Sequence, residues 1–295
     1  MVRSTEMRCV VFCHKAGWPS NWVATMKTLL FMFVFQASVL AFTLPAQAPT
    51  ELFDHDHPVW DELLAGHVHA GGMVDYRGLA KQRGRLDPYL ESLQAVTAKE
   101  YATWENKERE AFWINAYNAY TVLLILDNYP VESIRDLGGF FSPVWKKRFI
   151  PLQHLAPGHK KTLSLDEVEH GILAGTARQP LFHFAIVCAS ASCPELRPEA
   201  YTAAKLDGQL AEAGRGFLAD KSKNAARVRD GKLRISKIFD WSKGELKAFP
   251  GGIRGLLLEY GPQEMLITLK DANVPLAYLD YDWSINEWIP PRKER

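Results

Sequence analysis

The longest stretch of the chain without a polar face lies between residues 105 and 128, where apolar side chains occupy nearly every helical position. The pattern begins at Glu105 and ends at Tyr129-Pro130, because proline stops a helix at or near the preceding residue. A helix that is apolar nearly all round belongs inside the protein. The pattern therefore predicts a central helix over residues 105–128.

A second apolar run, residues 181–188, is short and rich in β-branched and aromatic side chains. This composition is typical of a strand buried on both faces. Alternation along such a strand would put His183 and Cys188 on opposite faces. The run therefore predicts a strand that presents Cys188 at its end, and a His183 that belongs to the core and is a poor base for that thiol.

Periodicity and turn signals indicate further elements on both sides of these two runs. Helices are expected near residues 58–67, 80–96, 164–174, 202–220 and 241–261, and extended segments near 74–79, 146–151, 161–163, 232–239, 263–269 and 274–283. Helices outnumber strands, and no internal repeat or linker follows residue 50. The fold class predicted is α+β, a single helix-rich domain with a small central β-sheet.

Residues 26–48 have the pattern of a secretory signal. Lys27 precedes an apolar core at 28–42 that is short for a membrane span, and an A-x-A site follows at Ala46 to Ala48. Residues 1–25 are interpreted as an over-early start. We expect a secreted or periplasmic mature domain of residues 49–295; the alternative is an inner-membrane anchor formed by residues 28–42.

Net charge and the positions of histidine, cysteine and acidic residues indicate which ligands and cross-links to expect. The net charge is +1, and no basic stripe with interleaved aromatics is present, so nucleic acid is not expected as a partner. No spacing of His, Cys and carboxylates completes a metal site, and no cofactor is expected. Removal of the leader leaves Cys188 and Cys193, which an oxidising compartment would allow to form a disulfide.

Cys188 is the strongest candidate for chemistry in the sequence. It follows the apolar run and precedes Ala-Ser-Ala-Ser, small residues that allow a ligand to approach the backbone closely. A nucleophile at the carboxyl end of a buried strand is a common arrangement in α/β scaffolds. The alternative is inert packing, since cysteine is among the most buried residue types.

Two polar residues interrupt the apolar face of the predicted helix at 164–174. Ser164 and Glu167 form an S-x-x-E capping box that opens this helix. A step of 100° per residue then places Glu169 within the apolar face and His170 at its edge. A carboxylate in that position is costly unless it is paired. One interpretation is that Glu169 caps a loop or pairs with an arginine. The other is that Glu169 and His170 face Cys188, where a nearby histidine would lower the pKa of the thiol.

Asn115 and Asn118 lie on one stripe of the predicted central helix. Buried amides must find hydrogen-bond partners. Bridging a loop is the first interpretation of both residues, and orienting a catalytic histidine or a substrate is the second.

Taken together, these segments resemble domain-of-unknown-function family 547. The motifs that carry the resemblance are V-D-Y-R-G-L (74–79), A-F-W-I-N-A-Y-N-A (111–119), L-S-L-D-E-V-E-H-G-I-L (163–173), H-F-A-I-V-C-A-S-A-S-C-P-E-L-R-P (183–198), I-F-D-W (238–241) and Y-L-D-Y-D-W-S-I-N (278–286). The resemblance, to a secreted bacterial member, implies that Asn115, Asn118, Glu169, His170 and Cys188 occupy the family's signature positions. Ala189 stands where the family pattern has glycine, which raises the question of a positive φ at that position.

The residue types favour a thiol hydrolase acting on a peptide, an amide or a thioester. In this hypothesis Cys188 is the nucleophile, His170 the base, and Glu169 or Asn115 orients the imidazole. Ser190, Cys193, Asn118 and backbone N–H groups of residues 189–193 would line the oxyanion or substrate pocket. The partner would be a small molecule or a peptide, with membrane contact only through an uncleaved leader. The alternative is a non-enzymatic binding or scaffold domain in which the cysteines pair or pack.

Overall fold

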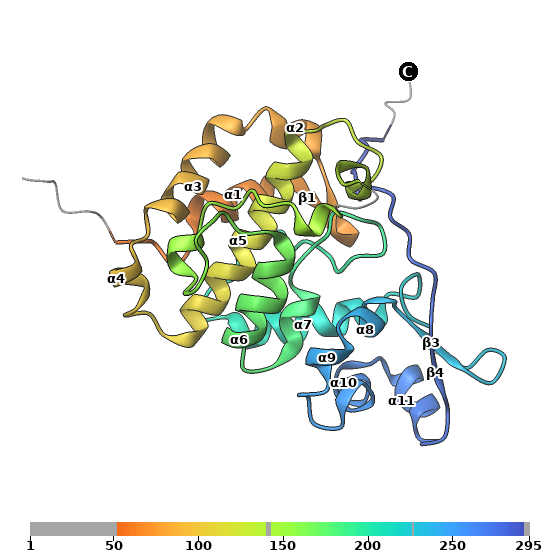
Figure 1. Cartoon of the computed structure of the whole chain (residues 1–295). Coiled ribbons are helices and arrows are strands. Elements are labelled where there is room, and N and C mark those ends of the chain that lie inside the picture. Colours follow the sequence, from red (N-terminus) through yellow and green to blue (C-terminus); the bar gives the residue numbers. More distant parts are fainter. Residues whose placement is uncertain (1–51, 140–142, 226, 292–295) are drawn as a thin grey trace, which may run out of the picture. The chain divides into compact units, whose positions relative to one another are not determined.

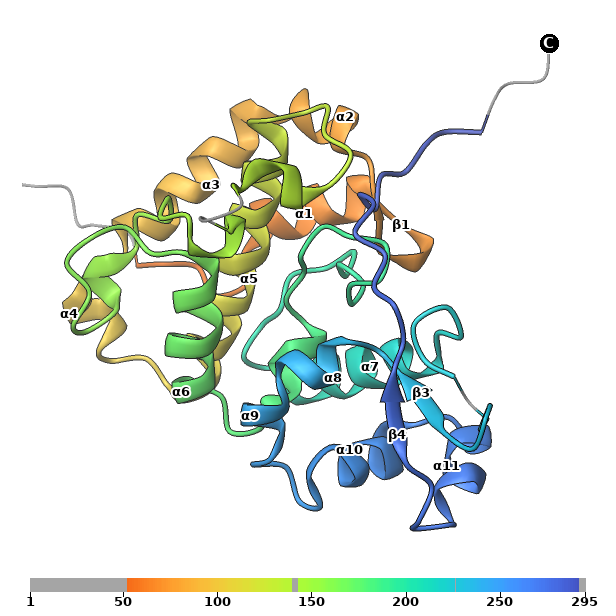
Figure 2. The same cartoon turned by 45° about the vertical axis from the view of Figure 1, so that its right-hand side comes forward.

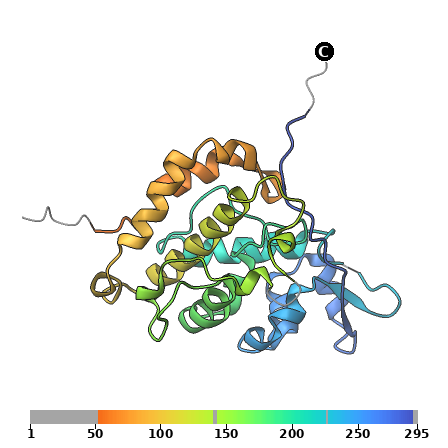
Figure 3. The same ribbon diagram turned by 45° about the horizontal axis from the view of Figure 1, so that its top comes forward.

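Helix α5 (Asn106–Leu126) is the centre of the fold, as its apolar pattern predicted. The computed structural model describes residues 52–139, 143–225 and 227–291, so the predicted leader at 26–48 lies outside the described residues. Figures 1 and 3 show α5 in the middle of the described part, between the orange N-terminal helices and the green and cyan segments. Nearly every side chain from Glu110 to Ile125 is buried.

The described residues form a helix-rich α+β structure, and residues Glu51–Arg295 belong to one compact unit. The α-helices are α1 (Pro58–His67), α2 (Tyr76–Ala80), α3 (Arg83–Ala95), α4 (Ala98–Tyr101), α5, α6 (Ala174–Thr176), α7 (Leu206–Ala219), α8 (Ile238–Trp241), α9 (Lys243–Leu246), α10 (Gly252–Tyr260) and α11 (Gln263–Leu269). The 3₁₀ turns are η1 (Ala70–Gly72), η2 (Ile134–Leu137), η3 (Val144–Lys146), η4 (Gln153–Leu155) and η6 (Pro180–Phe184), and η5 (Glu167–Leu173) is a π-helix. Among these residues, no helix is long and apolar enough to cross a bilayer.

The β-structure consists of two separate two-stranded sheets among the described residues, where the sequence predicted one central sheet. Strands β1 (Val68–His69) and β2 (Met73–Val74) are antiparallel, with Val68 opposite Val74. Strands β3 (Leu233–Ile235) and β4 (Leu276–Tyr278) are parallel, with Leu233 opposite Leu276. The predicted fold class is confirmed, and helices rather than a sheet provide the core.

Two predicted strands are wrong, and most of the extended segment expected at residues 74–79 is helix α2 (Tyr76–Ala80). Residues 180–184 form η6 and residues 263–269 form α11. A short buried apolar run cannot be assigned from periodicity alone. In α11, Met265 and Leu269 lie four residues apart and share the buried face, which is a helical spacing. The segment after η6 is held by the side chain of Asn118 in α5 rather than by neighbouring strands.

The chain after β4 returns across the molecule and completes the region around Cys188. In Figures 1 and 2 this dark-blue segment runs from β4 past the neighbourhood of β1. Isolated β-bridges join Ser190 to Ile285 and Val74 to Glu287. The side chain of Asn286 accepts a hydrogen bond from the Tyr76 hydroxyl at 2.8 Å. Residue 285 is therefore fixed against the loop that follows Cys188, and residues 286 and 287 are fixed against residues 76 and 74.

Candidate functional site

A cavity of about 590 Å³ brings together several of the predicted site residues. Glu169, His170, Cys188 and Cys193 all line it, together with His183. A second hollow of about 350 Å³, beside β1 and α7, contains none of these residues. The larger cavity is therefore the candidate site.

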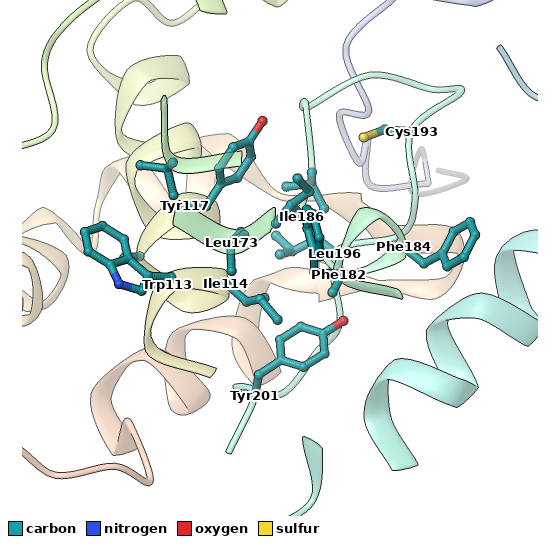
Figure 4. Packing of buried hydrophobic residues seen from close by; sticks show 14 of the residues in the cluster. Trp113, Ile114, Tyr117, Leu173, Phe182, Phe184, Ile186, Cys193, Leu196 and Tyr201 are labelled. Carbon is teal, nitrogen blue, oxygen red and sulfur yellow. The ribbon is translucent and has the colours of Figure 1, made fainter. Parts of the chain in front are cut away.

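Asn118 fixes the backbone that leads to Cys188. Its side-chain N–H donates to the carbonyl of Ala185 at 2.9 Å, and its Oδ1 accepts from the N–H of Val187 at 2.9 Å. Both groups would have been paired by neighbouring strands if this segment were the predicted strand. Figure 4 shows Tyr117 of α5 near Ile186 of this segment, with Cys193 on the loop beyond. Asn118 is buried and does not line the cavity, so its observed role is to position the backbone.

Asn115 makes the same pair of bonds to a different segment. It donates to the carbonyl of Tyr201 at 2.7 Å and accepts from the N–H of Tyr201 at 3.0 Å. It does not line the cavity, so the structure gives it the loop-bridging role and not the imidazole-orienting one. The prediction that both amides are buried and hydrogen-bonded is confirmed.

The Cys188 thiol lies close to two hydroxyl groups. Its Sγ is 3.0 Å from Ser190 Oγ and 3.0 Å from the Tyr281 hydroxyl, and the Cys188 N–H donates to Cys193 Sγ at 2.8 Å. Burial alone would raise the pKa of this thiol, but hydrogen bonds with Cys193, Ser190 and Tyr281 bring the pKa below its ordinary value. Burial and the adjacent Cys188 raise the pKa of Cys193 well above normal. Of the two thiols, Cys188 is therefore the one that ionises.

Both cysteines are free thiols in the structure, so the disulfide considered from the sequence is not formed. Burial, and then the nearby Cys188, raise the pKa of Tyr281, which keeps its hydroxyl protonated. A protonated phenol can donate a hydrogen bond to a thiolate. This arrangement stabilises the ionised form of Cys188 without a cationic partner in contact.

Ala189 has a left-handed backbone, with a φ of 53°. The resemblance stated above implies glycine at this position, and glycine adopts such a φ without steric strain. Ala189 therefore adopts the backbone conformation that glycine would favour at this position. The loop shape at the site is retained at the expense of local strain.

Fewer backbone N–H groups are available for an oxyanion than the sequence suggested. The N–H groups of Ala191, Ser192 and Cys193 donate to the carbonyls of residues 284, 282 and 190. The N–H groups of Ala189 and Ser190 have no hydrogen-bond acceptor among the described residues. These two N–H groups directly follow the nucleophile candidate, but Ala189 and Ser190, the latter predicted from the sequence to line the pocket, do not line the cavity.

Glu169 forms a hydrogen bond with His183, whereas the sequence predicted that it would orient His170. Its Oε1 is 3.1 Å from His183 Nδ1, and the Ser242 hydroxyl is 3.2 Å from the same nitrogen. The His183 side chain is only 1% exposed, and its Nε2 has no hydrogen-bond partner among the described residues. A buried nitrogen without a partner is uncommon and calls for a functional explanation.

His170 is oriented toward another carboxylate. Its Nδ1 is 2.9 Å from Glu245 Oε1, and its side chain is 40% exposed. Burial alone would lower the pKa of His170, but the Glu169 and Glu245 carboxylates raise it above the ordinary value. Among the described residues, no hydrogen bond joins either His170 or His183 to the Cys188 thiol. The argument against His183 rested on a strand that the structure does not contain.

The π-helix η5 explains how adjacent residues both reach the cavity. The predicted capping box is present, with Ser164 N–H donating to Glu167 at 2.9 Å and Glu167 N–H donating to Ser164 Oγ at 3.2 Å. A π-helix is wider than an α-helix and is frequent at functional sites. The 100° step used for the sequence therefore does not apply beyond the first turn, and both Glu169 and His170 line the cavity.

Among the cavity residues that were not assigned to the site from the sequence are His183, Tyr281 and Arg135. His183 and Tyr281 lie within motifs that carry the family resemblance, which was the available signal. Arg135 lies outside those motifs, and nothing in the sequence distinguished it from other surface arginines. No group of three or more His, Cys, Asp or Glu side chains suited to a metal ion occurs in the described part of the chain.

Comparison with known proteins gives one match. The model of a family described as protein of unknown function, DUF547, matches residues 101–218. The comparisons with curated proteins and with solved structures give no match. The matched range contains α5, Glu169, His183 and Cys188, and it agrees with the family that the sequence motifs indicated. Residues 101–218 of this chain thus match family DUF547, and they include α5, Glu169, His183 and Cys188.

Proposed function

We propose that the protein is a cysteine-nucleophile hydrolase that cleaves an amide or thioester, with Cys188, His183 and Glu169 as its reacting groups. The observation that carries the proposal is the Cys188 thiol at the cavity wall, with its pKa lowered by hydrogen bonds with Cys193, Ser190 and Tyr281. The Glu169–His183 pair lines the same cavity. An acid, an imidazole and a thiol in one cavity supply the parts of a nucleophilic triad.

The base in this proposal is His183 instead of His170. The Glu169 carboxylate at Nδ1 fixes the tautomer in which Nδ1 carries hydrogen and Nε2 is free to take a proton. Nε2 is also the atom without a partner among the described residues. Catalytic hydrogen bonds are often long in the absence of substrate and shorten when it binds, so the missing bond to Cys188 is compatible with the role.

The reaction has two halves, and it begins once the Cys188 thiol has given its proton to His183 Nε2. The Cys188 thiolate attacks the carbonyl carbon, forming a C–S bond, and the electron pair of the carbonyl π bond moves to the oxygen, which becomes an oxyanion. Collapse breaks the C–N or C–S bond to the leaving group, which takes a proton from the His183 imidazolium. Water then gives a proton to His183 as it attacks the thioester, and the product acid leaves as Cys188 is released as a thiolate.

The location is part of the same proposal. The leader pattern at residues 26–48 supports export, with the anchored form as the alternative. The substrate would then be an extracytoplasmic amide, peptide or thioester. N-terminal sequencing of exported protein tests this separately: a start near Pro49 supports cleavage, and retention of residues 28–42 supports the anchor.

Acyl transfer to Cys188 is tested with p-nitrophenyl acetate, a reactive acyl donor. We expect a burst of p-nitrophenolate, an acetyl group on Cys188 by peptide mass mapping, and no burst in Cys188→Ala. His183→Ala should slow both the burst and the later turnover, because both halves of the reaction lose their base. Acetylation of Cys188 no faster than that of free glutathione at the same pH would contradict the proposal.

A further inference from the structure

The cavity has an aromatic side that the proposed chemistry does not use, apart from the Tyr281 hydroxyl that contacts the Cys188 thiol. Trp145, Trp241, Tyr281 and Trp283 line it with aromatic rings from three separate segments of the chain. The Trp283 ring lies 5.6 Å from that of Trp145, 5.4 Å from that of Trp241 and 4.5 Å from that of Tyr281, measured between centroids. Trp241 is 46% exposed, so the cluster reaches the cavity mouth. Partly exposed aromatic surface of this kind is suited to apolar or aromatic groups of a ligand.

Arg135 lies at the edge of this aromatic wall. Its guanidinium carbon is 5.4 Å from the centroid of the Trp283 ring, and the residue lines the same cavity. Among the described residues, its guanidinium has no carboxylate partner, whereas Arg83, Arg148 and Arg197 all form ion pairs. A guanidinium held over an aromatic face keeps N–H donors in a planar fork that matches a carboxylate.

Charge is unevenly distributed in the cavity. The carboxylates of Asp166 and Glu169 lie on the π-helix side, and among the described residues no ion pair connects either of them to Arg135. An anionic ligand group is repelled by the first side and attracted by the second. The unevenness therefore gives a ligand one preferred direction, with its anionic group toward Arg135.

The geometry points to a substrate that carries an aromatic or bulky apolar group next to a carboxylate, such as the carboxyl-terminal aromatic residue of a peptide. The ring would lie against Trp241 and Trp283, and the carboxylate would accept hydrogen bonds from Arg135. This inference names the substrate class of the proposed hydrolase and rests on that proposal for the position of the scissile bond. The binding preference itself can be measured without catalysis.

The test uses the full chain with Cys188→Ser, and two probes that differ only in charge, N-acetylphenylalanine and N-acetylphenylalaninamide. Binding is followed by tryptophan fluorescence and calorimetry. We expect the carboxylate probe to bind about tenfold more tightly, the effect of one charge-assisted hydrogen-bonded pair. Arg135→Gln should reduce that preference to about twofold or less, and Trp241→Ala should weaken both probes.

Arg215→Gln is the matched control. Arg215 is also exposed and lies 5.8 Å from the centroid of an aromatic ring, that of Tyr260, but it does not line the cavity. This variant should keep the full preference. Equal affinity for the two probes, a preference that survives Arg135→Gln, or no binding of either probe at millimolar concentration would overturn the inference.

The outcomes separate this inference from the proposed function. Carboxylate selectivity lost in Arg135→Gln, without acetylation of Cys188, would leave the binding site standing and remove the hydrolase. Acetylation of Cys188 without carboxylate selectivity would do the reverse.

Discussion

Helix α5 holds two segments of chain in the same way, and only one of them leads to reactive chemistry. Asn115 is bonded to the backbone of Tyr201, and Asn118 is bonded to the backbone of Ala185 and Val187. Both amides donate once and accept once, and both are almost fully buried. The buried residues at Ala200, Tyr201 and Thr202 do not line the candidate site, whereas the segment at Val187 continues directly into Cys188.

The difference shows that the role of a buried polar side chain depends on the function of the segment to which it is hydrogen-bonded. From the sequence, the two asparagines are equivalent: same helix, same stripe, same residue type. The structure separates them, because one supports packing and the other supports packing and positions the thiol. This distinction can be tested by making the same substitution at Asn115 and at Asn118 and comparing the reactivity of Cys188 in the two variants.

The largest expected effect concerns a third polar side chain of α5, the carboxyl of Glu110. Burial, with a smaller contribution from Asp207, raises its pKa to about 7. The pKa of Glu110 is higher in the folded state than in the unfolded state. Protonation of Glu110 therefore contributes fully to the free energy of unfolding below a pH of about 4.5, and this contribution is lost as the pH rises toward 7. Glu110→Gln should therefore raise the free energy of unfolding at pH 8 by up to about 3 kcal/mol, and change it little at pH 4.

Urea unfolding at the two pH values measures this effect. The substitution would make Glu110 resemble the two asparagines, as an uncharged amide that keeps an oxygen for the N–H of Arg178. Equal stability of the variant and the parent at pH 8 would show that the Glu110 carboxyl is solvated in the native protein.

Next in size is removal of either amide. Asn115→Ala and Asn118→Ala should each lower the free energy of unfolding by roughly 1 to 3 kcal/mol, since each leaves one buried N–H and one buried C=O without a partner. Only Asn118→Ala should also change the rate of Cys188 alkylation in the folded state. If Asn115→Ala slowed alkylation as much, the two segments would not be distinct in function.

A smaller effect is expected from the strain at Ala189. Ala189→Gly should relieve the left-handed backbone and raise stability by up to about 1 kcal/mol, after the greater unfolded-state freedom of glycine is subtracted. Ala200→Gly, in the segment held by Asn115, is the control. Ala200 is buried and is not among the described residues with a positive φ, so this change should destabilise. Thermal melts of both variants in parallel decide the point, and a loss of stability in both would exclude strain at 189.

Much of the fold could be predicted from the sequence where a pattern is long or local. The all-round apolar character of residues 105–128 indicated a central helix, and the Ser164–Glu167 capping box was found as predicted. The segment 181–188 could not be assigned, because its backbone partner is the side chain of Asn118, which lies 67 residues from Ala185. No local pattern reports a hydrogen bond over that separation.

The same limit applied to the site. Cys188 and Glu169 were identified from residue type and position. His183, the histidine that Glu169 contacts, was rejected as a base because residues 181–188 were predicted to form a strand. Tyr281 reaches Cys188 only because the chain after β4 returns across the molecule, with a separation of 93 residues between the two. The π-helix also removed the periodicity on which the placement of His170 depended.

The measurement that tests the account most directly is the pH dependence of Cys188 alkylation by iodoacetamide in the folded protein, followed by peptide mapping. In the parent, the thiolate should form below the ordinary thiol pKa of about 8.5. Tyr281→Phe should raise that pKa by removing a hydroxyl contact, and His183→Ala should raise it by removing the proposed proton acceptor, while His170→Ala should leave it unchanged. Alkylation of Cys188 only after denaturation, or a pKa that moves with His170 and not with His183, would contradict the central claim that Cys188 and His183 act together.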